Sequence, residues 1–253
     1  MILSILGVNN EKYTYTCSSH GIYCRLWRGS SSSKSKVTEV DFNNTNAKYD
    51  LKEYLQEDSL VVYNVNHYTD SSGKKKYSDK NKVETFPTQK SVRTNNVISL
   101  KDGSEKEIGT ITIFANKLQK KSGSTTLEFA RNFDENDILS KSITPEDIAT
   151  AKVKLIRICE AKDILKTKEV KSVEYKDVLE IECNTNSLLI GKDKNVKDAS
   201  LEKRELIYLA EKKGIIFSES ESCTSVTNLT LGQETKVKVC EKEIKEMLSF
   251  NKL

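Results

Sequence analysis

The sequence predicts a mainly β protein with peripheral helices, because β-branched and aromatic residues recur in short alternating runs. Residues 60–65 (LVVYNV) form one such run. Residues 97–101 and 108–114 form two more, and Asp102-Gly103 lies between them. Asp-Gly between two alternating runs is the strongest short-range signal for a β-hairpin. We therefore predict a hairpin with its tip at residues 102–103.

The composition describes a polar chain that still has the material for a core. Of the 253 residues, 36% are hydrophobic and 31% are charged, and only two are prolines. The apolar residues are clustered, which indicates a folded core with long solvated loops. The net charge of +4 is mildly basic and does not by itself indicate a nucleic-acid partner.

The first 58 residues are predicted to form a β-rich extension. Apolar residues alternate with polar residues at 13–17 and again at 22–27, and the intervening residues 18–21 are typical of a turn. We expect two short strands here, followed by a serine-rich loop at 30–33.

The last part of the chain, residues 186–253, is predicted to form a helical extension. Residues 201–213 have amphipathic helical spacing and are followed by Gly214, which suits the position after a helix end. A second stripe with helical spacing lies within 237–248. This second helix is either part of the core or a docking helix for another subunit. Its partner-binding residues would be Val237, Ile244, Met247 and Leu248.

The order of the elements between these extensions is informative. Over residues 59–185 it is strand, long loop, hairpin, short helix, strand, strand. The short helix is expected at 144–149, where Thr144-Pro145-Glu146-Asp147 is a typical helix start. This order resembles the OB-fold, a five-stranded β-barrel. We therefore expect an OB-like barrel over 59–185, flanked by the N-terminal strands of 1–58 and the C-terminal helices of 186–253.

Within OB-fold proteins, the chain is similar to the OB-fold hub subunit of ciliate telomerase, the counterpart of the shelterin protein that recruits telomerase. The similarity rests on the barrel pattern at 59–185, on the Lys/Asn-rich composition and on the size of the chain. The resemblance implies a scaffold whose barrel contacts the telomerase catalytic subunit and other OB-fold subunits, without chemistry of its own.

A basic loop follows the first strand of the expected barrel. Residues 71–93 contain seven basic and two acidic side chains, a net charge of +5. Cations and aromatic rings on such a loop can bind phosphates and stack on the bases of a single strand. The alternative is a flexible loop that lysines keep soluble. The candidate nucleic-acid-binding residues are Lys74, Lys75, Lys76, Tyr77, Lys80 and Lys82.

Little in the sequence indicates catalysis or a metal. The only histidines are His20 and His67, and no nucleophile, phosphate-binding or zinc-protease motif is present. Cys17, His20 and Cys24 are metal-like ligand types across a turn, but a structural zinc site needs four ligands. We expect a strand turn with two buried thiols, no enzyme activity, no metal and no cofactor.

The six cysteines include no Cys-x-x-Cys pair, and the apolar start of the chain is too short for a signal sequence. We therefore expect free thiols and an intracellular, nuclear protein without a membrane partner. The predicted function is a non-catalytic scaffold that joins protein subunits of a nucleoprotein complex and contacts nucleic acid indirectly or weakly. Direct binding of single-stranded nucleic acid is the alternative. A secreted or surface β-protein with three disulfides is a third class.

Overall fold

A computed structural model describes residues 2–6, 12–17, 24–27, 39–75, 77, 82–230 and 233–253, with side chains for 39–75, 77, 89–229 and 233–253. The chain divides into two compact units, Met1–Val37 and Thr38–Leu253. In the described part of the first unit, β1 (Ile2–Leu6), β2 (Lys12–Cys17) and β3 (Cys24–Trp27) form an antiparallel sheet in that order. Cys17 of β2 pairs directly with Cys24 of β3, and the turn expected at 18–21 lies outside the described residues.

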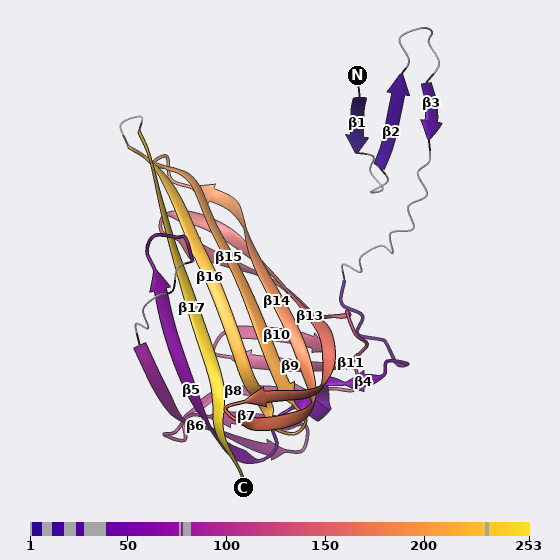
Figure 1. The fold of residues 1–253 in the computed structure, drawn as a ribbon, viewed down its shortest axis with the longest axis vertical. Helices are drawn as coiled ribbons and strands as arrows, with labels where there is room; N and C mark the ends of the chain where they lie inside the picture. Colours follow the sequence, from indigo (N-terminus) through magenta and orange to yellow (C-terminus); the bar gives the residue numbers. More distant parts are fainter. Residues whose placement is uncertain are drawn as a thin grey trace. The chain divides into compact units, whose positions relative to one another are not determined.

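The second unit is built on one antiparallel sheet, which has twelve strands in the described residues. Neighbours in sequence are neighbours in the sheet, except that β5 pairs with the C-terminal strand β17 (Figure 1). In order across the sheet the strands are β10 (Thr125–Ala130), β9 (Lys117–Ser122), β8 (Glu107–Ile113), β7 (Val97–Lys101), β6 (Lys82–Thr94), β5 (Ser59–Asp70), β17 (Gln233–Lys252), β16 (Gly214–Thr230), β15 (Val196–Ala210), β14 (Val173–Lys192), β13 (Ala151–Val170) and β12 (Ile138–Ile148).

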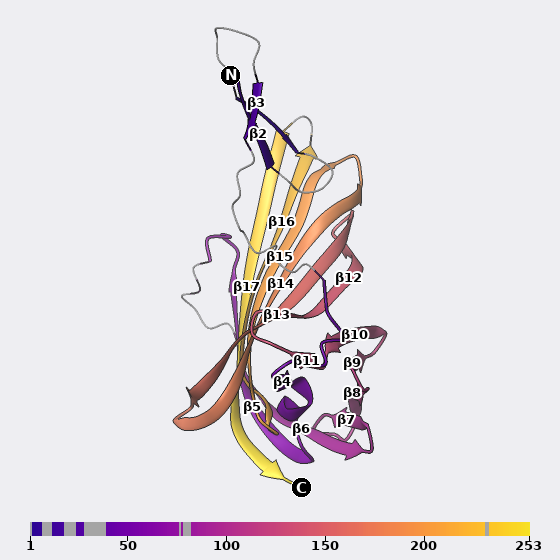
Figure 2. The ribbon, with the colours of Figure 1, turned by 90° about the vertical axis from the view of Figure 1, so that its right-hand side faces the viewer.

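The sheet curls until its two edge strands meet, so it is a nearly closed barrel. The hydroxyl of Ser140 on β12 donates a hydrogen bond to the backbone carbonyl of Glu128 on β10, 2.6 Å away. A short pair, β4 (Tyr49–Asp50) with β11 (Asn132–Phe133), and a single-turn 3-10 helix, η1 (Leu51–Tyr54), complete the unit. Figure 2 shows η1 enclosed between the short strands β7–β9 and the long strands of the sheet.

The core of the barrel is centred on η1. Asp50 caps this helix by accepting a hydrogen bond from the backbone N–H of Lys52 at 2.9 Å, which satisfies one of its unpaired donors. Leu51 and Tyr54 are buried and pack against both walls of the barrel. The cluster combines these two with Ile98, Leu100, Ile113, Leu118, Phe133, Leu139, Cys159, Ala161, Leu179, Ile181 and Cys183.

Both faces of the long strands carry buried side chains. Leu179 of β14 belongs to the cluster around η1, whereas its neighbour Val178 belongs to a second cluster with Tyr175, Tyr208 and Met247. Consecutive strand residues point to opposite faces, so the sheet is covered on both sides at this level. A third, smaller cluster lies toward the other end of these strands and contains Ile148, Ala151, Val153, Val196 and Ala199.

The expected hairpin at 102–103 is confirmed. β7 and β8 pair in register from Val97–Thr112 to Lys101–Glu107. The tip is held by the Asp102 carboxylate, which accepts hydrogen bonds from the backbone N–H groups of Ser104 at 2.9 Å and Lys106 at 3.0 Å. Aspartate favours this position because its side chain can replace missing backbone hydrogen bonds in a turn.

The expected helices are wrong. Residues 144–149 lie mostly in β12, 201–213 in β15 and the following turn, and 237–248 in β17. The apolar spacing resembled that of a helix because these strands are covered on two faces. On β15, Ile207 and Leu209 pack into the cluster around η1 while Leu206 packs into the second cluster. Pro145 is tolerated because β12 is an edge strand.

The mainly β class is confirmed, but the five-stranded OB-like barrel over 59–185 is corrected. β5 pairs with β6 on one side and with β17, which ends at Lys252, on the other. The barrel therefore needs the last third of the chain. Within the described residues, no helix is long and apolar enough to cross a membrane.

The expectation of free thiols is contradicted for four of the six cysteines. Cys159 and Cys183 form a disulfide between β13 and β14, and Cys223 and Cys240 form one between β16 and β17. Each bond joins residues that are direct partners in the strand register. This pairing could not be predicted from cysteine spacing, because the partners are 24 and 17 residues apart and meet only when the strands align.

Candidate functional site

Of the predicted nucleic-acid-binding residues, the structure describes the side chains of Lys74, Lys75 and Tyr77. The Lys75 ammonium group forms an ion pair with Glu221 of β16. Lys74 is exposed, and its backbone N–H binds the Asp70 carboxylate at 2.9 Å. Tyr77 is partly buried, and this burial raises the pKa of its hydroxyl to about 12. Lys76 and Lys80 lie outside the described residues. Lys82 begins β6 opposite His67, and its side chain is not described.

The predicted docking helix is a strand in the interior of the sheet. Its residues lie on β17, which is hydrogen-bonded to β16 and to β5. Met247 is 2% exposed and belongs to the second cluster, whereas Val237 and Leu248 are 50% and 46% exposed. Ile244 is partly buried. These residues therefore share no single face that a partner helix could use.

A candidate protein-binding surface lies on the strands β12–β14. Ile143, Leu188 and Ile190 are 58%, 56% and 51% exposed. Ile156 and Ile158 of β13 are partly buried and lie between them. Ile143 is the direct partner of Ile156. Leu188 is the direct partner of Lys154, which is two residues before Ile156 on the same strand. Direct partners, and residues two apart on a regular strand, share a face of the sheet. Ile190 lies in a bulge between the pairs Val153–Leu189 and Lys152–Gly191, and it is included because it is exposed next to this face. We call these five residues the isoleucine patch.

The opposite face of the same strands is packed. Val153 is fully buried, and Leu155 and Leu189 pack with it in the third cluster. The exposed residues of the isoleucine patch alternate with these buried ones, so their exposure is a consequence of the strand register. The sequence contained the signal, because residues 188–190 (LLI) place apolar side chains on both faces, but it did not show which face would be covered.

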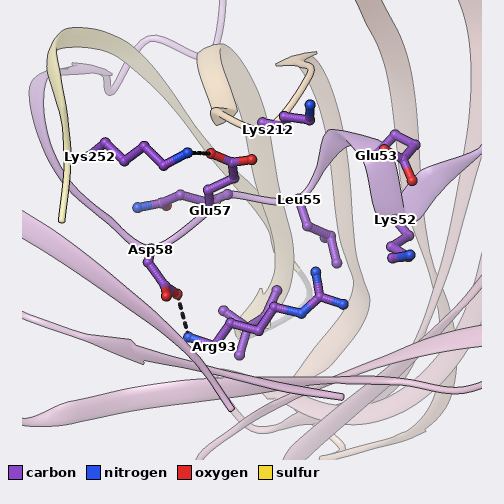
Figure 3. Close-up of a pocket in the computed structure, with 10 residues that line it drawn as sticks. Lys52, Glu53, Leu55, Glu57, Asp58, Arg93, Lys212 and Lys252 are labelled. Carbon is purple, nitrogen blue, oxygen red and sulfur yellow. Dashed lines mark hydrogen bonds and ion pairs between the residues drawn. The ribbon is translucent and has the colours of Figure 1, made fainter. Parts of the chain in front are cut away.

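A second candidate surface lies beside η1, where two adjoining cavities of about 360 Å³ and 400 Å³ share Lys52 and Arg93 in their walls. We call the two cavities together the basic groove, and Figure 3 shows the residues that line the first of them. The first cavity is also lined by Glu53, Glu57, Asp58, Lys212 and Lys252. The second is also lined by Asn96, Ile113, Phe114, Ala115 and Arg131.

The floor of the basic groove is fixed by backbone hydrogen bonds. The N–H of Glu57 donates to the carbonyl of Lys212, and the N–H of Lys212 donates to the carbonyl of Glu53, both at 2.8 Å. The N–H of Leu253 donates to the carbonyl of Asp58 at 3.0 Å. The segment after η1 is therefore tied to the turn after β15 and to the end of β17.

Two acids of the groove already have partners. Lys252 forms an ion pair with Glu57 at 2.9 Å, and the Asp58 carboxylate accepts the backbone N–H of Arg93 at 2.6 Å (Figure 3). The Arg93 guanidinium donates to the carbonyl of Asn95. Among the described residues, neither this guanidinium nor the Lys52 ammonium group has a carboxylate oxygen within 4.0 Å. These two cations are therefore available in the groove.

Arg131 has a structural partner. Its guanidinium lies 2.7 Å from an oxygen of Asp50, the residue that caps η1. Burial raises the pKa of Asp50, but the hydrogen bonds from Arg131 outweigh it and the pKa is lowered. Arg131 also donates to the carbonyls of Phe114 and Ala115 at 3.3 and 3.4 Å. It therefore holds the wall of the second cavity against η1.

A row of polar side chains crosses the sheet on the face that carries the Cys159–Cys183 disulfide. Direct pairing continues from Cys183 to Glu205, Ser220, Glu243 and His67. Ser220 and His67 are separated by Glu243 and thus by two strand spacings, about 10 Å. His67 instead lies 3.4 Å from Glu243. This order does not place the histidine as a base for the serine.

The structure does not describe the side chains of the possible metal site at Cys17, His20 and Cys24. The side chains of Cys17 and Cys24 are not described, and His20 is outside the described residues. Among the residues with described side chains, no group of three His, Cys, Asp or Glu side chains is arranged to hold a metal ion. No protein-family model, no curated protein and no solved structure matches the chain.

Proposed function

We propose that the chain is a non-catalytic protein-binding subunit and that the isoleucine patch is its docking surface. A contiguous exposed apolar surface on a folded protein is typical of an interaction site. Three aliphatic side chains more than half exposed, on the two strands β12 and β14 that flank β13, are the observation that supports the proposal. The scaffold function expected from the sequence thus rests on a different surface from the C-terminal stripe.

The surroundings of the patch indicate the chemistry of its partner. Lys152 and Lys154 are exposed on β13, on the same face as Ile156 and Ile158, and one exposed acid, Asp147 of β12, lies opposite Lys152. The rim is therefore basic by one net charge. A partner that buries the aliphatic side chains must also approach these ammonium groups. An apolar surface with an acidic rim would provide both contacts, and opposite charges at the rim speed association and select the partner.

The disulfides bear on where this function takes place. Disulfides persist in oxidising compartments and are rare in the cytosol and nucleus. The two bonds in the sheet therefore favour a secreted or surface β-protein over the nuclear protein expected from the sequence. A place in a nucleoprotein complex, including a role as a telomerase hub, stays a prediction, as does single-strand binding by Lys74–Lys82.

The test uses the full chain and two double variants as immobilised bait. Each bait captures proteins from an extract of the source cells and from their culture medium. Ile143→Asp with Leu188→Asp places charges in the isoleucine patch. Ile108→Asp with Val173→Asp is the matched control, since these residues are 44% and 46% exposed elsewhere. Proteins bound by the native chain and cross-linked to β12–β14 are identified by mass spectrometry.

We expect the patch variant to lose a protein that the control variant retains. The patch variant must also show the native far-UV and near-UV circular dichroism, so that the loss reflects the surface and not the fold. An identical set of bound proteins for the native chain and the patch variant would contradict the proposal.

A further inference from the structure

The second cavity of the basic groove has an unusual distribution of charge. Lys52, Arg93 and Arg131 line it, and no acidic side chain does. Arg131 is neutralised by Asp50. Among the described residues, Asp50 is close enough to Lys52 for that ammonium group to lower its pKa, but neither Lys52 nor Arg93 forms an ion pair within 4.0 Å. The two cations come from separate elements, η1 and the end of β6. Two cations without an ion-pair partner, in a cavity that no acidic side chain lines, favour an anionic ligand.

An aromatic ring completes the same cavity. Phe114, in the turn after β8, is 41% exposed, whereas its neighbour Ile113 is buried. The Lys117 ammonium group lies over this ring, 5.6 Å from its centroid. One face of the ring is thus occupied by a cation. The exposed part of the ring can stack against a planar group.

The frame of the cavity is preorganised. The Phe114 N–H donates to the carbonyl of Lys117 at 2.9 Å, and Arg131 binds the Phe114 carbonyl from the other side. The N–H of Ile113 donates to the carbonyl of Asn96 at 2.7 Å. The turn that carries the ring is therefore held by backbone contacts, so a ligand need not order it. This lowers the entropic cost of binding.

From these contacts we infer that the second cavity binds a nucleoside phosphate. Its phosphate would lie on Lys52 and Arg93 and its base against Phe114. A volume of about 400 Å³ suits a ligand of this size. Arginine is well suited to phosphate, because its planar donors match two phosphate oxygens at once. This site is separate from the isoleucine patch and does not depend on the proposed protein partner.

The test is calorimetric titration of the purified full chain with adenosine monophosphate, adenosine and inorganic phosphate. Adenosine monophosphate should bind with one-to-one stoichiometry, and the other two should bind more weakly, because each makes half of the contacts. Lys52→Ala with Arg93→Ala should weaken binding by about 10–100-fold, the loss expected for hydrogen bonds to a charged group. Phe114→Leu should weaken it about 5–100-fold through lost stacking.

The control is Lys106→Ala with Lys121→Ala, which removes the same charge from exposed lysines outside the groove. It should bind as the native chain does. If adenosine monophosphate shows no saturable binding at millimolar concentration, or binds equally well to the double variant and to Phe114→Leu, the inference is wrong. All these substitutions lie on accessible side chains, and circular dichroism checks that each variant is folded.

A further titration separates a free nucleotide from a nucleotide within a strand. A short oligothymidylate is compared with thymidine monophosphate at several salt concentrations. If the strand uses only this cavity, log affinity against log salt should have a slope near the 0.7 of one phosphate. A steeper slope and a tighter complex would assign the groove to single strands. Equal affinity would assign it to free nucleotides.

Discussion

Cys159 and Cys183 lie directly opposite each other on the two longest paired strands, β13 and β14, and a disulfide joins them. Cys223 and Cys240 repeat this relationship on β16 and β17. All four residues are buried, so both bonds lie inside packed parts of the sheet. Two hairpins of one sheet are therefore covalently fixed in register. Register matters here because a slip by one residue would exchange the two faces of every long strand.

The first prediction concerns the number of free thiols. Alkylation of the unreduced, denatured chain should modify no more than two cysteines, Cys17 and Cys24, and alkylation after reduction should modify all six. Mass spectrometry reads both numbers directly. Modification of Cys159, Cys183, Cys223 or Cys240 without reduction would show that these thiols are free, as the sequence suggested.

The disulfides should also contribute to stability. Cys223→Ser with Cys240→Ser should lower the free energy of unfolding by about 3 kcal/mol, because the bond closes a loop of 17 residues in the unfolded chain. Chemical denaturation of the two proteins measures the difference. The native chain in a reducing agent is the control and should lose at least as much, since both bonds are then open. An unchanged midpoint in both cases would contradict the role of the bonds.

The sequence predicted the β class and the 102–103 hairpin because both depend on local patterns. It could not predict the barrel, because β5 closes onto β17 across more than half of the chain. It assigned helices to the C-terminal third because buried residues on both faces of β15 and β17 gave no clean alternation. The basic groove was invisible for a related reason: Lys52, Arg93 and Phe114 become neighbours only in the fold.

The second prediction concerns the ion pair between Arg157 and Glu205 inside the sheet. Their side chains are 21% and 19% exposed, and Arg157 Nε lies 3.0 Å from Glu205 Oε2. Glu205→Gln should cost about 2 kcal/mol, less than the 3–5 kcal/mol of a fully buried pair, because water still reaches both groups. A double-mutant cycle with Arg157→Met should show positive coupling. Additive effects would mean that the two groups do not interact.

The same pair fixes the sign of a pH effect. Burial raises the pKa of Glu205, but Arg157 and Lys203 outweigh it, and the net pKa lies below 4.5. The unfolded chain therefore takes up this proton first as pH falls, and the stabilisation is lost below about pH 4.5. The stability difference between the native chain and Glu205→Gln should shrink from pH 6 to pH 3. A constant difference would contradict the assignment.

The third prediction concerns Lys245 of β17. Burial, together with the nearby Lys120, lowers the pKa of its ammonium group to about 8. Between pH 8 and 10 the folded state thus binds fewer protons than the unfolded state, so stability should rise with pH. Lys245→Met should remove this rise and stabilise the protein at pH 7. Because the ammonium group also lies 3.8 Å from the centroid of the Tyr63 ring, we expect a gain of only about 1–2 kcal/mol.

Denaturant unfolding at pH 7, 8 and 9.5 checks this prediction. Lys236→Met on the same strand is the control, because Lys236 is exposed and should change neither the stability nor its pH dependence. A loss of stability in Lys245→Met at pH 7 would show that the contact with Tyr63 outweighs the cost of burying the charge.

The last prediction distinguishes the strand from the docking helix that the sequence suggested. Met247 and Leu248 are neighbours, yet one is 2% and the other 46% exposed. The Tyr175 hydroxyl lies 3.7 Å from the Met247 sulfur, so Met247 is fixed between the sheet and the β13–β14 hairpin. Met247→Ala should cost about 2–5 kcal/mol through the cavity it leaves, and Leu248→Ala less than about 0.5 kcal/mol. In a docking helix the two adjacent residues would share one partner face, and neither change would destabilise the isolated chain. Thermal unfolding of the two variants therefore decides between the structures. Equal, small losses of stability would favour the docking helix, whereas a large loss of stability in Met247→Ala alone is expected for the strand.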